Sequence, residues 1–256
     1  MRHTFSVLVA ASLVSAAAGQ SCTPAWDTTI GVPGAPSGYV GALWMYQGDV
    51  IASGSFQNMA GAANSQYLAR YNRGTNTWSA FPGGINMGIS NAFGTSFATL
   101  GTDLYVGGFF SNAGGMPDTK SIARWDGSAF NSLHTGWGPD TVNAVWSMLA
   151  TDEIGGVPRV YFGGGFDVLN GQPAGCIASW DGTSCTALAP TMTLAGINPL
   201  VDAITVFDDG QGGGKQLYIG GRFATVGALA TRMIAVSYTH LRAHETKANL
   251  VCRLLL

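Results

Sequence analysis

The chain of 256 residues carries 12 Lys and Arg against 14 Asp and Glu, which gives a net charge of −2. This balance leaves no basic surface for a nucleic acid or an anionic membrane, so no nucleic-acid partner is expected. The hydrophobic fraction of 46% is that of a globular protein, and 37 glycines favour tight turns between short strands over helices. The composition therefore predicts an all-β protein.

The N-terminal segment has the pattern of a secretory signal peptide. Arg2 and His3 precede an apolar run over 5–18, and small residues follow, so we assign 1–20 to a cleaved signal. The alternative is a buried N-terminal helix. The run is too short to span a bilayer and no later stretch is long enough, so no membrane span is expected. The protein is predicted to be secreted or to lie at the cell surface.

One sequence pattern then occurs four times. Its fullest copy is Leu104-Tyr-Val-Gly-Gly-Phe-Phe110, followed after a polar connection by Ser121-Ile-Ala-Arg-Trp-Asp-Gly127. A self-similar period of about 55 residues indicates a repeat architecture, in which each unit buries its apolar face against its neighbours. The phenylalanines that mark the four copies are Phe56, Phe110, Phe166 and Phe223.

Each copy contains four short apolar segments that are expected to be strands. In chain order they are a Val-x-Ala segment, the Leu-Tyr-Val-Gly-Gly segment, the Ile-Ala-Arg-Trp segment and one that starts at a Trp or its substitute. Asp126-Gly127 and Asp181-Gly182 mark hairpins between the third and fourth strands, because Gly accepts a positive φ. Four antiparallel strands make one propeller blade, so the sequence predicts a β-propeller fragment of four blade-like repeats over 21–235.

Residues that recur in every copy are interpreted as structural anchors. Paired glycines leave no side chain on either face of a strand, which lets a neighbouring sheet approach closely. A phosphate-binding glycine loop is the alternative, but no helix is expected after these glycines. The anchors are Gly54, Phe56, Tyr71, Trp78, Gly107, Gly108, Phe110, Trp125, Gly163, Gly164, Phe166, Trp180, Gly220, Gly221 and Phe223.

The pattern resembles kelch-type repeats. A double glycine after an apolar run, followed by Arg70-Tyr-Asn-Arg-Gly-Thr-Asn-Thr-Trp78, is similar to the kelch motif. The Gly-Gly-x-Phe and Ile-Ala-Arg-Trp-Asp-Gly sequences resemble kelch-like repeats of secreted bacterial surface proteins. The resemblance covers about 26–235 and implies a propeller. Propellers of this kind include enzymes, adhesion proteins and scaffolds, so the resemblance implies no particular activity.

The copies depart from the kelch pattern at a few positions. Ser53 replaces the first glycine in copy one, and Phe130 and Cys185 replace the tryptophan. Copy four stops at Ala235 and is expected to lack its own fourth strand. The segment near Trp26 is expected to complete the last blade of the natural protein. For the repeats present here an open arc is favoured over a small closed ring, because kelch-type rings commonly hold more blades.

The composition changes abruptly at Val236. Residues 236–256 contain no Gly or Pro, turn basic, and interrupt the motif that begins Met233-Ile-Ala-Val. The segment resembles a read-through string at the ends of unrelated translated gene fragments and is similar to a translated sequencing adapter. We therefore expect 236–256 to be a non-native tail that packs poorly, and the natural protein to continue beyond this fragment.

Histidines and carboxylates offer few candidates for chemistry. His134 is the one histidine between the predicted signal and tail, whereas a propeller oxidase needs two for copper, and we expect it in a solvated turn. His240 and His244 have the spacing of a zinc pair on a helix but lie in the tail. Asp126 and Asp181 could be glycosidase carboxylates, but they hold equivalent repeat positions and are interpreted as turn residues.

Two further motifs are candidates for a metal site or a covalent bond. Asp208-Asp-Gly-Gln-Gly212 hints at a calcium loop but lacks the alternating oxygen ligands and closing Glu, which favours a plain hairpin. Cys176 and Cys185 flank a predicted hairpin. With a two-residue turn Cys185 faces Ala178, so a disulfide to Cys176 requires a shifted register or a bulge.

Taken together, these patterns predict a secreted or surface-exposed module that binds an extracellular protein or a glycan. No catalytic residue, metal or cofactor is expected in the portion present. The alternative is a fragment of an extracellular carbohydrate-active or oxidase enzyme whose catalytic residues lie in missing blades or a missing domain. Non-repeated carboxylates or histidines at one rim would favour the enzyme, and an exposed aromatic or polar rim would favour binding.

Overall fold

The computed structural model describes residues 38–86, 93–136, 143–210, 214–231, 233–237 and 241–243. Strands and turns make up these residues, with one 3-10 helix, η1 (Met59–Gly61), and no α-helix among them. The all-β prediction is therefore confirmed. The predicted signal peptide, Cys22, Trp26 and the histidines of the tail lie outside the described residues.

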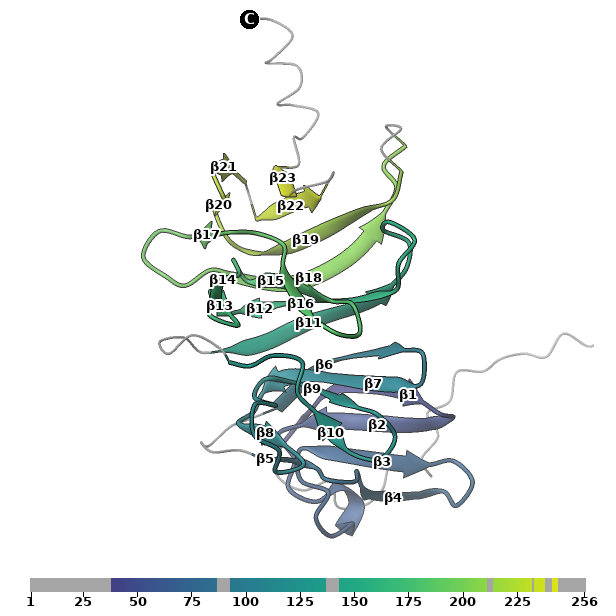
Figure 1. Ribbon diagram of the computed structural model, residues 1–256. Helices are drawn as coiled ribbons and strands as arrows, with labels where there is room; N and C mark the ends of the chain where they lie inside the picture. The colour runs from purple at the N-terminus through teal and green to yellow at the C-terminus, as the bar shows by residue number, and fades with distance from the viewer. Residues whose placement is uncertain are drawn as a thin grey trace, which may run out of the picture. The chain divides into compact units, whose positions relative to one another are not determined.

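Four antiparallel sheets of four strands follow one another along the described chain (Figure 1). Sheet 1 consists of β1 (Val40–Tyr46), β2 (Asp49–Gly54), β3 (Leu68–Asn72) and β4 (Thr77–Ala80). Sheet 2 consists of β6 (Phe93–Leu100), β7 (Asp103–Phe109), β9 (Ile122–Trp125) and β10 (Phe130–Asn131). Sheet 3 consists of β11 (Ala144–Thr151), β12 (Arg159–Gly165), β15 (Ile177–Trp180) and β16 (Cys185–Ala187). Sheet 4 consists of β18 (Leu200–Phe207), β19 (Gln216–Arg222), β22 (Ile234–Ser237) and β23 (Leu241–Ala243). Each predicted repeat thus forms one four-stranded sheet.

The connections and loops contain short strand pairs that the sequence pattern does not predict. Two of them tie a connection to the loop of the next repeat: β5 pairs with β8, and β17 pairs with β20. The other pairs lie within single loops. The strands of these ladders are β5 (Ile85–Asn86), β8 (Asn112–Ala113), β13 (Val168–Leu169), β14 (Gln172–Pro173), β17 (Met192–Thr193), β20 (Thr225–Val226) and β21 (Leu229–Ala230).

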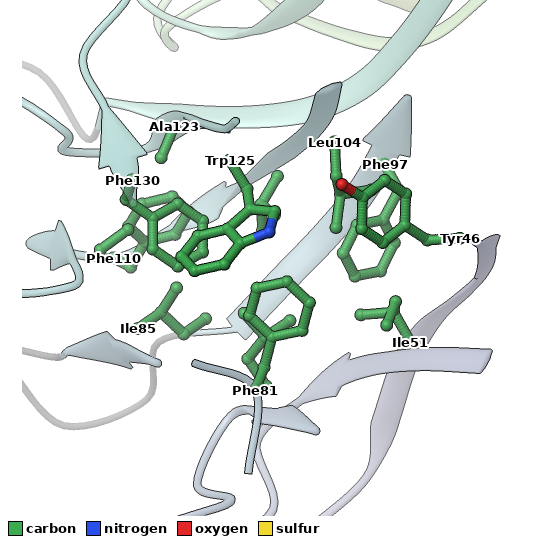
Figure 2. Packing of buried hydrophobic residues seen from close by; sticks show 13 residues of the cluster. Tyr46, Ile51, Phe81, Ile85, Phe97, Leu104, Phe110, Ala123, Trp125 and Phe130 are labelled. Atoms are coloured by element: carbon green, nitrogen blue, oxygen red, sulfur yellow. The ribbon is translucent and has the colours of Figure 1, made fainter. Parts of the chain in front are cut away.

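Hydrophobic clusters lie between sheets that are consecutive in the chain. The cluster between sheets 1 and 2 includes Tyr46 and Ile51 from sheet 1 and Trp125 from sheet 2 (Figure 2). Trp125 packs edge-on against Phe81 and Phe130, with ring centroids 5.2 and 5.1 Å apart. Equivalent clusters lie between sheets 2 and 3 and between sheets 3 and 4. Each sheet therefore buries one face against the next, as a stacked repeat requires.

The second glycine of each pair faces a β-bulge in the first strand of its own sheet. The register shifts between Val145 and Ser147 in sheet 3, and the other three sheets shift at the equivalent place. A Cβ on Gly164 would lie 1.8 Å from the carbonyl oxygen of Ala144, and one on Gly221 would lie 2.2 Å from a carbonyl oxygen in its sheet. Only glycine fits there, because the bulged backbone occupies the space of a side chain.

The first glycine of the pair has a different neighbour. A Cβ on Gly107 would lie 2.7 Å from Cγ1 of Val145, and a Cβ on Gly163 would lie 2.5 Å from Cγ1 of Val201. Both valines belong to the following sheet. The missing side chain therefore lets two sheets approach each other closely at this point of the repeat.

A non-glycine residue with positive φ precedes the third strand of every sheet. In sheet 3 this residue is Cys176, whose N–H donates to the carbonyl of Phe166 at 2.8 Å and whose carbonyl accepts from Gly164 N–H at 3.1 Å. Such a conformation is sparsely populated, and here it recurs with the repeat, so it serves the fold. The four residues are Tyr67 (φ 64), Ser121 (φ 66), Cys176 (φ 64) and Met233 (φ 66).

Sheet 4 contains a fourth strand, which corrects the prediction that copy four lacks one. Strand β23 pairs with β22, with Ala235 opposite Ala243. Strand β22 itself continues to Ser237, and Val236 is fully buried and lies opposite Tyr218. The change in composition at Val236 thus falls inside a paired strand. The prediction failed because any extended backbone can satisfy the hydrogen bonds of an open sheet edge.

Candidate functional site

A cavity of about 550 Å³ lies between sheets 3 and 4. Its walls come from the end of β12 with the loop that follows, the loop before β15, and the connection from β16 to β18. The lining residues are Trp146, Gly165, Phe166, Asp167, Val168, Pro173, Gly175, Cys176, Pro190, Thr191, Met192, Asn198, Pro199 and Leu200. The walls are mostly apolar, with a few polar groups at the loops, which is the usual make-up of a small-molecule site.

Trp146 is one of the two aromatic residues that line this cavity, and a β-bulge positions it. It is the extra residue between Val145 and Ser147 in β11, and it is half-buried. A bulge inserts an unpaired residue and re-aims its side chain. The same position holds Gly41 in sheet 1 and Asp202 in sheet 4, so the tryptophan is particular to repeat three.

Asp167 is a second lining residue particular to this repeat. It follows the anchor Phe166, and the corresponding residues of the other copies are Gln57, Ser111 and Ala224. Its carbonyl accepts the N–H of Ala174 at 2.7 Å, which closes the loop around the β13–β14 ladder. Neither Trp146 nor Asp167 is predicted by the repeat pattern, because neither residue recurs in the other copies. Both lie at positions where each copy has a different residue. A residue of this kind can serve one repeat alone, and that lack of repetition is the signal that could have found them.

Thr191 and Asn198 complete the polar part of the lining. Both are exposed and belong to the connection between β16 and β18. The carbonyl of Thr191 accepts the N–H of Gly227 at 2.8 Å, so the loop between β20 and β21 holds this wall in place. The cavity therefore presents a carboxylate, a hydroxyl and an amide beside an aromatic ring.

Cys176 lies in the cavity wall as a protonated thiol. Its Sγ donates to the carbonyl of Pro199 at 3.3 Å, and burial raises the pKa of the thiol to about 11. A thiol with so high a pKa carries almost no thiolate at neutral pH and is not a nucleophile. Its part in the site is structural.

The possible disulfide between Cys176 and Cys185 is not formed, because both cysteines are free. The hairpin loop has four residues instead of two, so Cys185 lies opposite Trp180 and not opposite Ala178. The thiol of Cys185 donates to the carbonyl of Leu133 at 3.1 Å, and burial raises its pKa to about 12. Cys185 packs against the cluster between sheets 2 and 3, whereas Cys176 belongs to the cluster between sheets 3 and 4.

Asp126 and Asp181 anchor their hairpin turns, as the sequence suggested. The Oδ1 atom of Asp126 accepts the N–H groups of Ser128 and Ala129, both at 2.9 Å, and Asp181 accepts the equivalent pair in sheet 3. These hydrogen bonds hold the pKa of both carboxyl groups well below the usual range. A glycosidase acid needs a raised pKa, so neither carboxylate suits that role.

Arg70 and Arg124, which share one repeat position, form ion pairs within their sheets. Arg70 lies 2.6 Å from Asp49, and Arg124 lies 3.5 Å from Asp103. Burial by itself raises the pKa of Asp49, but the hydrogen bonds and charge of Arg70 and Arg73 outweigh it, so the pKa is lowered overall. These charges are therefore satisfied within the sheet and do not belong to the cavity.

His134 is buried, which corrects the expectation of a solvated turn residue. Its Nε2 atom lies 3.1 Å from the carbonyl oxygen of Lys120, and burial lowers its pKa. Asp208 accepts the N–H of Gly210 at 2.9 Å in the loop after β18, as a turn residue does. Across the described ranges, no group of three or more His, Cys, Asp and Glu side chains is placed to hold a metal ion. No helix within those ranges is long and apolar enough to cross a membrane.

No known protein family matches the chain, and no curated protein matches it either. The kelch resemblance therefore depends on the repeat residues themselves.

Proposed function

We propose that the chain is a non-catalytic binding module of a kelch-like β-propeller, exported from the cell, and that the cavity between sheets 3 and 4 binds a carbohydrate. The propeller proposal is supported by four-stranded antiparallel sheets that pack face to face in chain order. The signal-like pattern of 1–20 supports export.

The lining of the cavity carries the proposal of a carbohydrate ligand. A sugar ring has an apolar face of C–H groups and a rim of hydroxyl groups. Trp146 offers an aromatic surface for the apolar face, while Asp167, Thr191 and Asn198 can hydrogen-bond hydroxyl groups. A volume of about 550 Å³ is in the range of small-ligand sites. A protein partner would instead need a contact surface of about 800 Å².

Binding without turnover fits the same lining better than hydrolysis does. Asp167 is the one carboxylate among the lining residues, whereas most glycosidases use a pair of carboxylates that flank the scissile bond. Cys176 is protonated and offers no nucleophile. We therefore place the bound sugar as a ligand and not as a substrate.

The test is binding to an immobilised glycan panel, followed by calorimetric titration of the oligosaccharide that binds best. Trp146→Ala should weaken that binding at least tenfold without a change in fold. Trp44→Ala is the matched control, since Trp44 is also partly exposed but lies in sheet 1, and it should leave the affinity unchanged. Absence of glycan binding, or equal affinity in the wild type and Trp146→Ala, would contradict the proposal. Release of reducing sugar that Asp167→Asn abolishes would favour the enzyme.

A further inference from the structure

The contact between consecutive sheets repeats in detail. In sheet 2, a Cβ on Gly107 would meet Val145 and Met148 of the following sheet. In sheet 3, a Cβ on Gly163 would meet Val201 and Ile204 of the following sheet in the same way. In both cases the two contacting residues are a valine and the apolar residue three positions after it. Each valine lies opposite the second glycine of its own sheet, Gly164 or Gly221.

The following sheet also buries the neighbours of these glycines. Ile122 lies opposite Gly107 and Ile177 lies opposite Gly163, and both isoleucines are 0% exposed. Each belongs to the hydrophobic cluster formed with the following sheet. The glycine and isoleucine thus mark a face that another sheet covers.

The equivalent face of sheet 4 is open. A Cβ on Gly220 would meet only the carbonyl oxygen of Met233, at 3.9 Å. Ile234, which lies opposite Gly220, is 49% exposed, and Phe207 on the neighbouring strand β18 is 58% exposed. We call Phe207, Gly220 and Ile234 the trailing face.

Sheet 1 exposes the residues that would fill such a face. Val40 lies opposite Gly54, as Val145 and Val201 lie opposite their glycines, and Leu43 is three positions later. Val40 is 45% exposed and Leu43 is 62% exposed, while Val145 and Val201 are fully buried. We call Val40, Leu43 and the equally exposed Met45 the leading face.

We propose that the trailing face of one molecule binds the leading face of a second copy of this chain. Val40 of the second copy then lies over Gly220, as Val201 lies over Gly163 within the chain. A second copy is the occupant because both faces are exposed on the same molecule, and because the contact continues an interface that the chain already forms between its own sheets. Such a head-to-tail contact uses two different surfaces, so association can extend beyond a dimer or close into a ring of copies.

Sedimentation velocity over a range of protein concentrations tests the association. The wild type should form dimers or larger species as the concentration rises. Leu43→Lys should raise the dissociation constant at least tenfold, and so should Gly220→Val, because the new side chain occupies the place of Val40. Both positions have room in the single molecule, so the fold is preserved. Val157→Lys changes an equally exposed valine outside both faces and should have no effect. A wild type that stays monomeric at the highest concentration would overturn the proposal.

Engineered cysteines distinguish a second copy from the chain's own first sheet. The ideal Cβ position at Gly163 lies 2.9 Å from Cβ of Val201, so a small relaxation brings the equivalent pair to disulfide distance. Val40→Cys and Gly220→Cys, purified separately and oxidised as a mixture, should give a covalent dimer that neither variant alone nor the wild type gives. A disulfide within one chain of the Val40→Cys/Gly220→Cys double variant at high dilution would overturn the second-copy proposal. Efficient dimers of Val40→Cys alone would contradict the head-to-tail contact.

Discussion

Replacing Gly163 by Ala should destabilise the protein, whereas replacing Gly220 by Ala should not, although both glycines hold the same repeat position. A Cβ on Gly163 would lie 2.5 Å from Cγ1 and 2.9 Å from Cβ of Val201, a short and stiff side chain. Relieving that overlap costs about 1–3 kcal/mol. A Cβ on Gly220 would meet its nearest neighbour at 3.9 Å, an ordinary contact. There the lower entropy of the unfolded chain should stabilise by about 0.4–1 kcal/mol.

Urea unfolding at low protein concentration measures the difference, with the m-value checked because independent unfolding of repeats would lower it. The two variants should differ by about 2 kcal/mol in unfolding free energy, since the effects have opposite sign. The double variant Gly163→Ala/Val201→Ala should lose less than the sum of the two single losses, because Val201→Ala removes the Cγ1 atom that the new methyl meets. Equal effects of the two glycine variants, or strict additivity in the double variant, would refute the reasoning.

Two further predictions concern titratable groups. Cys176 and Cys185, with pKa values of about 11 and 12, should resist iodoacetamide at neutral pH in the folded protein and react after unfolding, as followed by peptide mass spectrometry. Rapid labelling of either in the folded state would contradict their burial. Asp49, Asp126 and Asp181 have lowered pKa values in the folded state, so their stabilisation is complete above the unfolded value of about 3.9 and is lost as the pH falls through the folded values. Urea midpoints between neutral pH and about pH 2.5 should show this loss, with a smaller slope in Asp126→Asn.

The sheets could be predicted from sequence because their determinants recur. Apolar runs of strand length and a glycine pair occur at the same place in each copy. A pattern that occurs four times is unlike a chance arrangement of the same residues. The bulge could not be predicted, since it depends on the register of two strands. The cavity was missed for the same reason, because Trp146 is the extra residue of that bulge and resembles any other strand residue in the sequence.

The errors at the hairpins have one physical cause. A two-residue Asp-Gly turn was expected, but Asp181 accepts the N–H groups of Thr183 and Ser184 and so stabilises a loop of four residues. The longer loop places Cys185 opposite Trp180 instead of Ala178, two positions farther from Cys176, so the register shift that a disulfide required does not occur. Side-chain hydrogen bonds to the backbone can thus set a register that strand patterning leaves open.

The tail offers a comparison between pairing and burial. Truncation after Ala235 removes Val236, which is fully buried and lies opposite Tyr218 in β22. Losing a buried valine should cost about 1.5–3 kcal/mol of unfolding free energy. Truncation after Ser237 keeps Val236 and removes β23, a three-residue edge strand, and a change at an edge should stay within about 1 kcal/mol. Urea unfolding of the two truncated proteins beside the full chain measures both. Equal losses would show that Val236 adds no measurable stability to the sheet, which would contradict the expectation from its burial.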